Sequence, residues 1–127
     1  MTTINEILYT NYLDIHILEK KILLSNLLNT SKEELNLTTQ NKLSDNIIEN
    51  FNSLILRRRK NEPISYLTNI REFWKYEFYI NESVLIPRHD SEIIIETVLK
   101  FFPNINTKYS ILDLGTGSGC LIISLLK

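Results

Sequence analysis

The sequence predicts an α/β protein with a separate all-α N-terminal domain. Apolar residues recur at helical spacing, uninterrupted by glycine or proline, from residue 3 to about 60. The pattern changes to an alternation of period two between residues 64 and 85. All three glycines of the 127-residue chain then lie within residues 115–119, between two short apolar runs. We expect three parts: a helical bundle at residues 1–62, a β-hairpin linker at 63–86 and the start of an α/β domain at 87–127.

The N-terminal part is predicted to be a bundle of helices that folds independently of the rest. Ser31 and Glu34 have the spacing of a capping box, which predicts the start of a short helix. A longer helix is expected from about Gln40 to Lys60, ending in Arg-Arg-Arg-Lys at residues 57–60, where cations suit the negative end of the helix dipole. The apolar positions that define these helices are Ile4, Ile7, Leu8, Ile15, Leu18, Ile22, Leu23, Leu43, Ile47, Phe51, Leu54 and Ile55.

A β-hairpin is predicted after Pro63, which ends the bundle. Residues 64–67 (Ile-Ser-Tyr-Leu) are the expected first strand, and the loop is expected between Thr68 and Glu72. Because this loop contains no glycine, a two-residue primed turn is not expected. The second strand is predicted to present Trp74, Tyr76, Phe78 and Ile80 on one face, and Phe73, Lys75, Glu77 and Tyr79 on the other.

A further helix is predicted after Pro87. Asp90 or Ser91 is its expected N-cap, Glu92 lies in its first turn, and Pro103 ends it. Its apolar face consists of Ile94, Ile95, Val98, Leu99 and Phe102.

A strand, a tight loop and a helix are predicted to close the chain. The strand is expected at residues 109–114, and the helix opens at Gly119 or Cys120. Residues 121–126 are apolar nearly all round, so this helix needs burial on several sides. One parallel strand cannot provide that burial, because parallel sheets are built from several βα crossovers. We therefore expect the sequence to stop inside its second domain.

The loop from Asp113 to Gly119 has the spacing Asp-x-Gly-x-Gly-x-Gly. Glycine suits positions that need a positive φ or a close ligand, and N–H groups at a helix start point towards bound groups. A P-loop spacing is absent, and the dinucleotide fingerprint would need glycine where Cys120 stands. The spacing is that of the first motif of class I S-adenosylmethionine-dependent methyltransferases, a Rossmann-like fold. The predicted cofactor is S-adenosylmethionine, with Asp113 towards its ammonium group; a turn used only for packing is the alternative. The expected cofactor-binding residues are Gly115, Thr116, Gly117, Ser118 and Gly119.

Taken together, these segments resemble the release factor glutamine methyltransferases, also called HemK-like proteins. The resemblance follows the whole chain in order and is most specific from Pro63 to Gly119. The matching segments are residues 63–67 (Pro-Ile-Ser-Tyr-Leu), 71–74 (Arg-Glu-Phe-Trp), 84–92 (Val-Leu-Ile-Pro-Arg-His-Asp-Ser-Glu) and 112–119 (Leu-Asp-Leu-Gly-Thr-Gly-Ser-Gly).

The resemblance implies methyl transfer to the side-chain amide nitrogen of glutamine in the Gly-Gly-Gln motif of a peptide chain release factor. The family usually has glycine where Asn69 and Lys75 stand, and Pro-Glu-Thr where His89, Asp90 and Ser91 stand. The family's Asn-Pro-Pro-Tyr motif, which holds the acceptor glutamine, does not occur in these 127 residues. No catalytic residue is therefore assigned, and this chain alone is expected to be inactive. Two other functions stay open: a non-catalytic module that binds release factor, and an amino-methyltransferase acting on nucleic acid.

Composition excludes several classes of function. A net charge of −1 gives no overall attraction to nucleic acid or anionic membranes. The single cysteine cannot form an internal disulfide and fits a reducing compartment. No apolar run is long enough to span a membrane, and the N-terminus lacks a signal peptide pattern. We expect a cytoplasmic protein with no membrane, metal or direct nucleic-acid partner.

Several side chains have a structural and a functional interpretation. The cations at residues 57–60 would form a nucleic-acid patch or, as we favour, a solvated helix end. Trp74, Tyr76 and Phe78 would stack a base or, as we favour, pack in a core. Cys120 is expected to pack under the loop as a small buried residue.

Arg88, Glu92 and the two histidines are the other polar side chains whose role was considered. Arg88 and Glu92 would either order the site or form a structural ion pair, and both interpretations stay open. His16 and His89 have no partner at metal-ligand spacing and receive no role.

Overall fold

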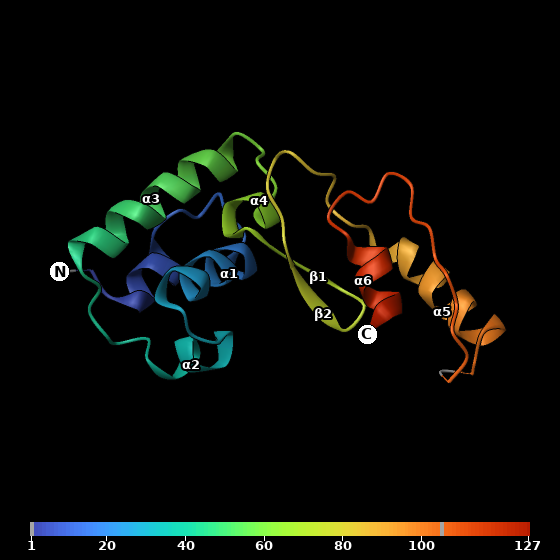
Figure 1. Cartoon of the computed structure of the whole chain (residues 1–127). Helices are drawn as coiled ribbons and strands as arrows, with labels where there is room; N and C mark the ends of the chain where they lie inside the picture. The colour runs from blue at the N-terminus through green and yellow to red at the C-terminus, as the bar shows by residue number, and fades with distance from the viewer. Residues whose placement is uncertain (1, 105) are drawn as a thin grey trace. The chain divides into compact units, whose positions relative to one another are not determined.

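A computed structural model of the chain describes residues 2–104 and 106–127 and divides into two compact units between Thr68 and Asn69 (Figure 1). The first unit is helical, as predicted. Its elements are the π-helix η1 (Glu6–Thr10) and the α-helices α1 (Ile17–Leu28), α2 (Lys32–Leu37), α3 (Asp45–Arg59) and α4 (Ile64–Thr68).

Helix starts in the first unit follow local side-chain chemistry. The predicted capping box of α2 is confirmed: the Glu34 N–H donates to Ser31 Oγ, and the Ser31 N–H donates to Glu34 Oε2, both at 3.1 Å. Helix α3 begins at Asp45, capped by Ser44, later than the predicted Gln40. The preceding residues are held by N-terminal backbone instead, because the Ile4 N–H donates to the Asn41 carbonyl at 3.0 Å.

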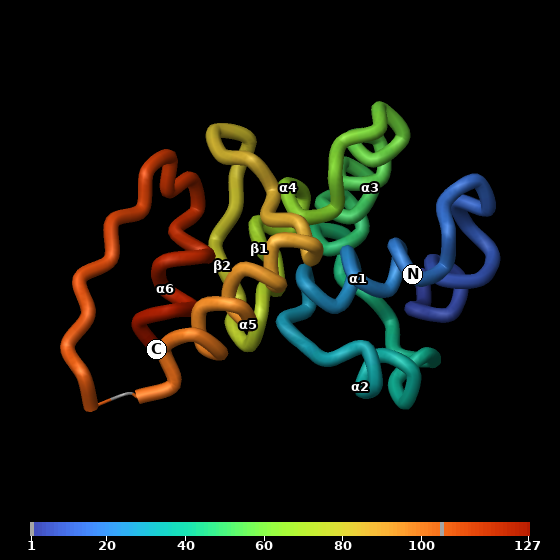
Figure 2. The backbone as a smooth tube through the Cα atoms, turned by 90° about the vertical axis from the view of Figure 1, so that its right-hand side faces the viewer, coloured from blue at the N-terminus to red at the C-terminus, as the bar shows by residue number. Residues whose placement is uncertain are grey.

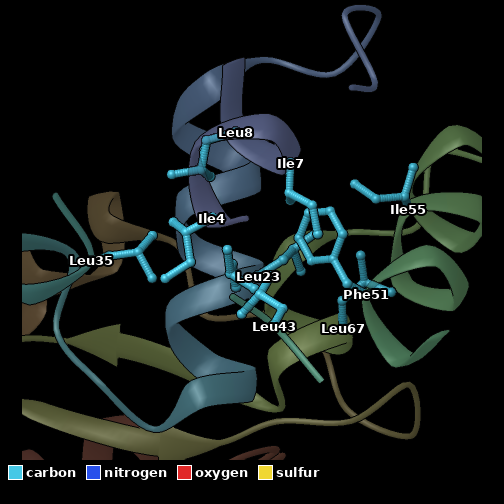
Figure 3. Close-up of a cluster of buried hydrophobic side chains, with 10 residues drawn as sticks. Ile4, Ile7, Leu8, Leu23, Leu35, Leu43, Phe51, Ile55 and Leu67 are labelled. Atoms are coloured by element: carbon cyan, nitrogen blue, oxygen red, sulfur yellow. The ribbon is translucent and has the colours of Figure 1, made fainter. Parts of the chain in front are cut away.

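A continuous apolar core holds the helical unit together (Figure 3). Leu18, predicted to face it, is 51% exposed, whereas Leu24 from the same helix is completely buried. Loop residues 11–16 separate η1 from α1, which resets the helical phase between the two apolar runs. The core side chains are Ile4, Ile7, Leu8, Leu23, Leu24, Leu35, Leu43, Phe51, Ile55 and Leu67.

The predicted strand at residues 64–67 is wrong, because these residues form helix α4. The Pro63 carbonyl accepts from the N–H groups of Tyr66 and Leu67, at 3.0 and 3.2 Å, which closes a helical turn directly after the proline. Leu67 is thereby buried in the core, and α4 packs on α1 and α3. The compact helical unit consequently extends to Thr68.

The second unit contains the predicted β-hairpin in a different register. Strands β1 (Ile70–Phe73) and β2 (Tyr76–Tyr79) pair antiparallel, with Phe73 opposite Tyr76. The loop is therefore the two residues Trp74 and Lys75, and the predicted loop at residues 68–72 is wrong. Trp74 adopts a φ of +58° itself, so the primed-type turn forms without glycine. Phe78 and Ile80 are buried as predicted, but Phe73, predicted on the opposite face, is also buried and packs edge-on against Phe78.

Two helices flank the remaining chain of the second unit. Helix α5 (Glu92–Phe101) follows the short 3-10 turn η2 (His89–Ser91) and ends before Pro103, as predicted. Helix α6 (Cys120–Leu126) begins after Gly119, as predicted, and packs beside α5 (Figure 2). The predicted strand at residues 109–114 does not form. The sheet made by the described residues contains β1 and β2 alone, so this segment has no neighbour for backbone pairing.

Candidate functional site

The loop before α6 carries the chain's glycines in left-handed backbone: Gly115, Gly117 and Gly119 have φ values of +75°, +58° and +78°. A Cβ on Gly119 would lie 3.0 Å from Ile123 Cδ1 of α6, so this position is both tight and left-handed. A Cβ on Gly117 would meet only the Gly115 carbonyl oxygen, at 3.9 Å. Backbone conformation therefore selects glycine at 117, and the space above it is open.

Internal hydrogen bonds fix the loop on the helix. The Gly119 N–H donates to the Thr116 carbonyl at 2.9 Å, and Thr116 Oγ1 donates to the Asp113 carbonyl at 3.2 Å. The Gly119 carbonyl then accepts from the Ile123 N–H at 2.9 Å, which begins α6. The loop is a hydrogen-bonded turn that leads directly into a helix.

Asp113 provides a polar atom that needs a partner. Its Oδ2 is buried and has no hydrogen-bond partner among the described residues. Such orphaned atoms are rare in folded proteins, since a buried carboxylate oxygen without a donor is unfavourable. The five predicted cofactor residues continue from it: Gly115, Thr116 and Gly117 are exposed, Ser118 is half-buried and Gly119 is buried. An open glycine turn beside an unpaired carboxylate oxygen fits the amino-acid end of S-adenosylmethionine.

Glu92 joins the hairpin to the first turn of α5. Its Oε1 accepts from the backbone N–H of Trp74 at 2.9 Å and lies 2.8 Å from His89 Nδ1. The Trp74 N–H, followed by His89, holds the pKa of Glu92 below its usual value. A second tie runs from Arg71 Nε to the Pro87 carbonyl, at 3.0 Å. Among the described residues the side-chain partners of Glu92 are thus Trp74 and His89, so Glu92 orders the hairpin turn and does not pair with Arg88. A role in ordering the cofactor site stays a prediction.

The turn that Glu92 holds is strained. A non-glycine residue in left-handed backbone costs roughly 1–2 kcal/mol. Sequence reasoning could not find the contact, because Trp74 and Glu92 are far apart along the chain and no local pattern links them. Asn69, where the resembling family has glycine, also has a positive φ of 58°, and its Nδ2 donates to the Ile80 carbonyl at 2.9 Å. Asparagine tolerates that conformation far better than tryptophan does.

An open cleft of about 890 Å³ lies in the second unit. Trp74, Tyr76, Leu99 and Phe102 are among its lining residues, and Ser124 contributes from α6. The predicted core packing of Trp74, Tyr76 and Phe78 is therefore confirmed only for Phe78. Trp74 and Tyr76 are half-buried and line the cleft.

Comparison with protein families identifies residues 4–68 as a PrmC N-terminal domain. The chain belongs to the release factor glutamine methyltransferase family. Similar proteins include a release factor glutamine methyltransferase from Leptospira interrogans, 39% identical over 85% of this chain and 38% of that protein. One of the same name from Buchnera aphidicola is 44% identical over 64% of this chain and 28% of that protein. A protein named bifunctional methyltransferase from Rickettsia typhi is 43% identical over 86% of this chain. The chain spans 24% of the length of that Rickettsia relative.

The three arginines that end α3 are engaged in ion pairs within this family domain. Arg58 Nη2 lies 2.7 Å from Glu19 Oε1 and Arg59 Nη2 lies 2.6 Å from Asp14 Oδ1, while Arg57 pairs with Glu62. Each arginine, by its hydrogen bonds, holds the pKa of its partner carboxyl below the usual value. These cations fasten the last turns of α3 to neighbouring segments. Three of the four charges at residues 57–60 are thus paired with carboxylates, which disfavours a nucleic-acid patch.

Other side chains have structural roles that the sequence did not reveal. Lys20 is buried, with its Nζ donating to the Asn11 carbonyl at 2.8 Å, and burial lowers the pKa of Lys20. His16, to which no role was assigned, caps α1 by accepting from the Leu18 N–H at 3.2 Å. Cys120 is buried, as predicted.

No group of three or more histidine, cysteine, aspartate or glutamate side chains suited to a metal occurs among residues 2–104 and 106–127. Within the same residues, every helix is too short or too polar to traverse a bilayer.

Proposed function

We propose that this chain is part of an enzyme that methylates the side-chain amide nitrogen of glutamine in the Gly-Gly-Gln motif of peptide chain release factors. The loop Gly115–Gly119 is its proposed S-adenosylmethionine site. The observation that carries this proposal is the open left-handed glycine turn beside the unpaired Oδ2 of Asp113. Its support from outside the structure is the name shared by the family members from Leptospira interrogans and Buchnera aphidicola.

The proposed roles follow from the chemistry of each group. Bound S-adenosylmethionine supplies an electrophilic methyl group on a sulfonium centre. Asp113 accepts from its ammonium group, and the exposed backbone at Gly115 and Gly117 lets its methionine and ribose parts approach closely. Thr116 and Ser118, from the same loop, are also proposed to contact the cofactor.

Methyl transfer also requires residues that position the acceptor glutamine, in addition to those that bind the cofactor. An amide nitrogen is a weak nucleophile because its lone pair is delocalised, so an enzyme must hold it in line with the methyl group. The Asn-Pro-Pro-Tyr motif that the family uses for this purpose does not occur in these 127 residues. We therefore expect these residues alone to bind cofactor weakly and to transfer no methyl group. The proposed location is the cytoplasm, which the single buried cysteine fits.

Glycine labelling tests the cofactor site directly. All three glycines lie in the loop, so a chain labelled with ¹⁵N-glycine gives amide signals from the loop alone. Titration with millimolar S-adenosylhomocysteine is expected to shift these signals. Gly117→Val should abolish the shifts, because a β-branched residue disfavours positive φ and fills the open space. Gly117→Ala is the graded control: its Cβ has room, but it shares the strain of the left-handed backbone, so it should weaken the shifts less than Gly117→Val does. Unchanged glycine signals in the folded wild-type chain would show that the loop is only a packing turn.

Activity and binding separate the enzyme from the alternatives. Incubation with methyl-labelled S-adenosylmethionine and a release factor is expected to leave the glutamine unlabelled by this chain and labelled by a longer family member that contains the same sequence. A non-catalytic binding module is the second candidate, because residues 1–68 form a compact unit with a core of their own and do not need the glycine loop to fold. Calorimetry of residues 1–68 with a release factor tests that candidate, which requires binding without the glycine loop.

A further inference from the structure

One carboxylate oxygen joins the hairpin, η2 and α5 of the second unit. Glu92 Oε1, at the start of α5, accepts from the backbone N–H of Trp74 at 2.9 Å and lies 2.8 Å from Nδ1 of His89 in η2. Trp74 has a left-handed φ of +58°, a conformation that persists in a non-glycine residue only when surrounding contacts hold it. Because a carboxylate oxygen has lone pairs for two partners, the contact with His89 affects how firmly Glu92 holds the turn.

The contact between His89 and Glu92 requires a proton on the imidazole. A nitrogen and an oxygen that lie 2.8 Å apart share a hydrogen, and an ionised carboxylate brings none. Glu92 is kept ionised, because the Trp74 N–H and then His89 hold the pKa of its carboxyl below the usual value. The imidazolium donates from Nδ1 in a charge-assisted bond, whereas the neutral ring has one proton for its two nitrogens and no charge. The contact is therefore stronger when His89 is protonated.

Imidazole is the only type of side chain in this cluster that ordinarily titrates between about pH 5 and 8. Arginine, lysine, aspartate and glutamate ordinarily titrate outside this range. The charged side chains that neighbour the cluster along its elements are Arg71, Glu72, Lys75 and Glu77 on the hairpin, Arg88 and Asp90 beside His89, and Glu96 one turn further along α5. A change in the turn between pH 5 and 8 is therefore expected to report His89.

A second bond confines this change to the turn itself. Arg71 Nε, on β1, donates to the Pro87 carbonyl at 3.0 Å. Neither group of this bond is a partner of His89, so the bond remains when the imidazole loses its proton. The hairpin thus stays attached to the segment before η2, while the hold on Trp74 varies.

We propose that His89 is a pH-responsive latch on the hairpin: when protonated it secures Glu92 on the Trp74 N–H, and when deprotonated it lets the strained turn relax. The hold is strongest below the titration range of imidazole and weakens as the pH rises through it. It is lost again in stronger acid, where Glu92 itself takes up a proton. The family usually has proline at position 89, so the latch is a feature of this chain. It involves neither the glycine loop nor a bound cofactor and is independent of the proposed function.

Isotopic labelling makes the held bond visible, because Trp74 is the only tryptophan in the chain. A chain labelled with ¹⁵N-tryptophan gives one backbone amide signal, that of the N–H which donates to Glu92. We expect its chemical shift to follow a single transition between about pH 5 and 8. Its hydrogen-exchange protection, corrected for the intrinsic exchange rate, should fall about two- to threefold as the pH rises, as for one ion pair with a largely exposed partner. An amide signal that shows no such transition would overturn the inference.

Three variants assign the transition to the latch. His89→Asn removes the titrating ring, and Glu92→Gln keeps an oxygen for the Trp74 N–H but carries no charge, so the transition should disappear in both. His16→Asn is the matched control, because it removes the only other histidine and asparagine can still cap α1. The transition should remain in this control. Its persistence in His89→Asn, or its loss in His16→Asn, would show that His89 is not the latch.

A variant with the family's residue covers the case in which His89→Asn fails to fold, which far-ultraviolet circular dichroism detects. In His89→Pro the preceding Arg88 is already extended, with φ −95° and ψ 140°, as a residue before proline must be. Its Trp74 amide should be protected equally at about pH 5.5 and pH 7.5, on either side of the imidazole titration. Protection that falls in His89→Pro as it does in the wild type would equally contradict the inference.

Discussion

The helical unit and the unit that carries the glycine loop bury their apolar side chains to very different extents. In the helical unit, the ten core side chains are each 6% exposed or less, and they come from five helices and the segments between them (Figure 3). In the second unit the hairpin supplies Phe73, Phe78 and Ile80 to the interior. Close to the loop, however, Leu112 and Leu114 are 81% and 83% exposed.

The difference follows from how each type of structure finds its partners. Helices joined by short loops meet neighbours that are close in sequence, so a short chain can enclose a core. A segment of parallel-strand character buries its side chains only when other strands and helices lie alongside it. The helical unit is therefore the stable part of these 127 residues, and the proposed cofactor loop stands on the less stable part.

Separating the two units gives the largest expected effect. Residues 1–68 should show a helical spectrum and melt cooperatively, whereas residues 69–127 should show no cooperative transition. Residues 1–62 should still fold but be less stable by about 2 kcal/mol, since they lack the buried Leu67 of α4. Circular dichroism with heating measures all three. A sharp melt of residues 69–127 would break the comparison.

Core truncation should affect the two units unequally. Phe51→Ala removes a completely buried ring from the helical core and should cost about 3–5 kcal/mol. Phe102→Ala removes a ring that is 51% exposed in the second unit, and its cost should be less than about 1 kcal/mol. Urea unfolding of the whole chain, followed by circular dichroism, measures both changes. Similar costs would mean that the second unit is packed as tightly as the first.

Acid should weaken the helical unit through its arginine-paired carboxylates. Arg59 and Arg58 hold the pKa values of Asp14 and Glu19 below the ordinary ones. The folded pKa is thus lower than the unfolded pKa, so each pair stabilises the fold fully above the unfolded value. That contribution is lost as the pH falls through the folded value, below about pH 4. Melting temperatures of residues 1–68 should therefore decline on acidification from pH 5 to 3, and the decline should be smaller in Glu19→Gln. An unchanged melting temperature would contradict the pairing.

Individual ion pairs should give the smallest effects. A double-mutant cycle with Arg58→Ala and Glu19→Ala, a pair about one-quarter exposed, should give a coupling of about 0.5–1 kcal/mol. The cycle for Arg59 and Asp14, about half exposed, should give a smaller coupling, and it should disappear first in high salt. Urea unfolding of the wild type and the six variants tests the order, and a reversed order would show that exposure does not control these pairs.

Local chemistry made several elements predictable from the sequence. Ser31 and Glu34 satisfy each other's backbone donors within one turn, so the start of α2 needs no distant partner. Pro103 likewise ends α5, and the glycines at 115, 117 and 119 adopt the left-handed backbone for which glycine is suited. The helical first unit and the position of α6 were predictable for the same reason, because they depend on the spacing of apolar residues and on where glycine and proline stand.

Tertiary contacts decided the elements that sequence patterns misassigned. Residues 64–67 alternate like a strand, yet they form α4 because Leu67 fills the core between α1 and α3. The hairpin turns at Trp74 because Glu92, from another element, holds a backbone conformation that tryptophan does not favour by itself. The segment at residues 109–114 has the composition of a strand and forms none, since a strand exists only through its neighbours. Composition and spacing therefore determined the family, the helices and the glycine loop, whereas pairing, burial and the placement of Trp74 depended on residues distant in sequence.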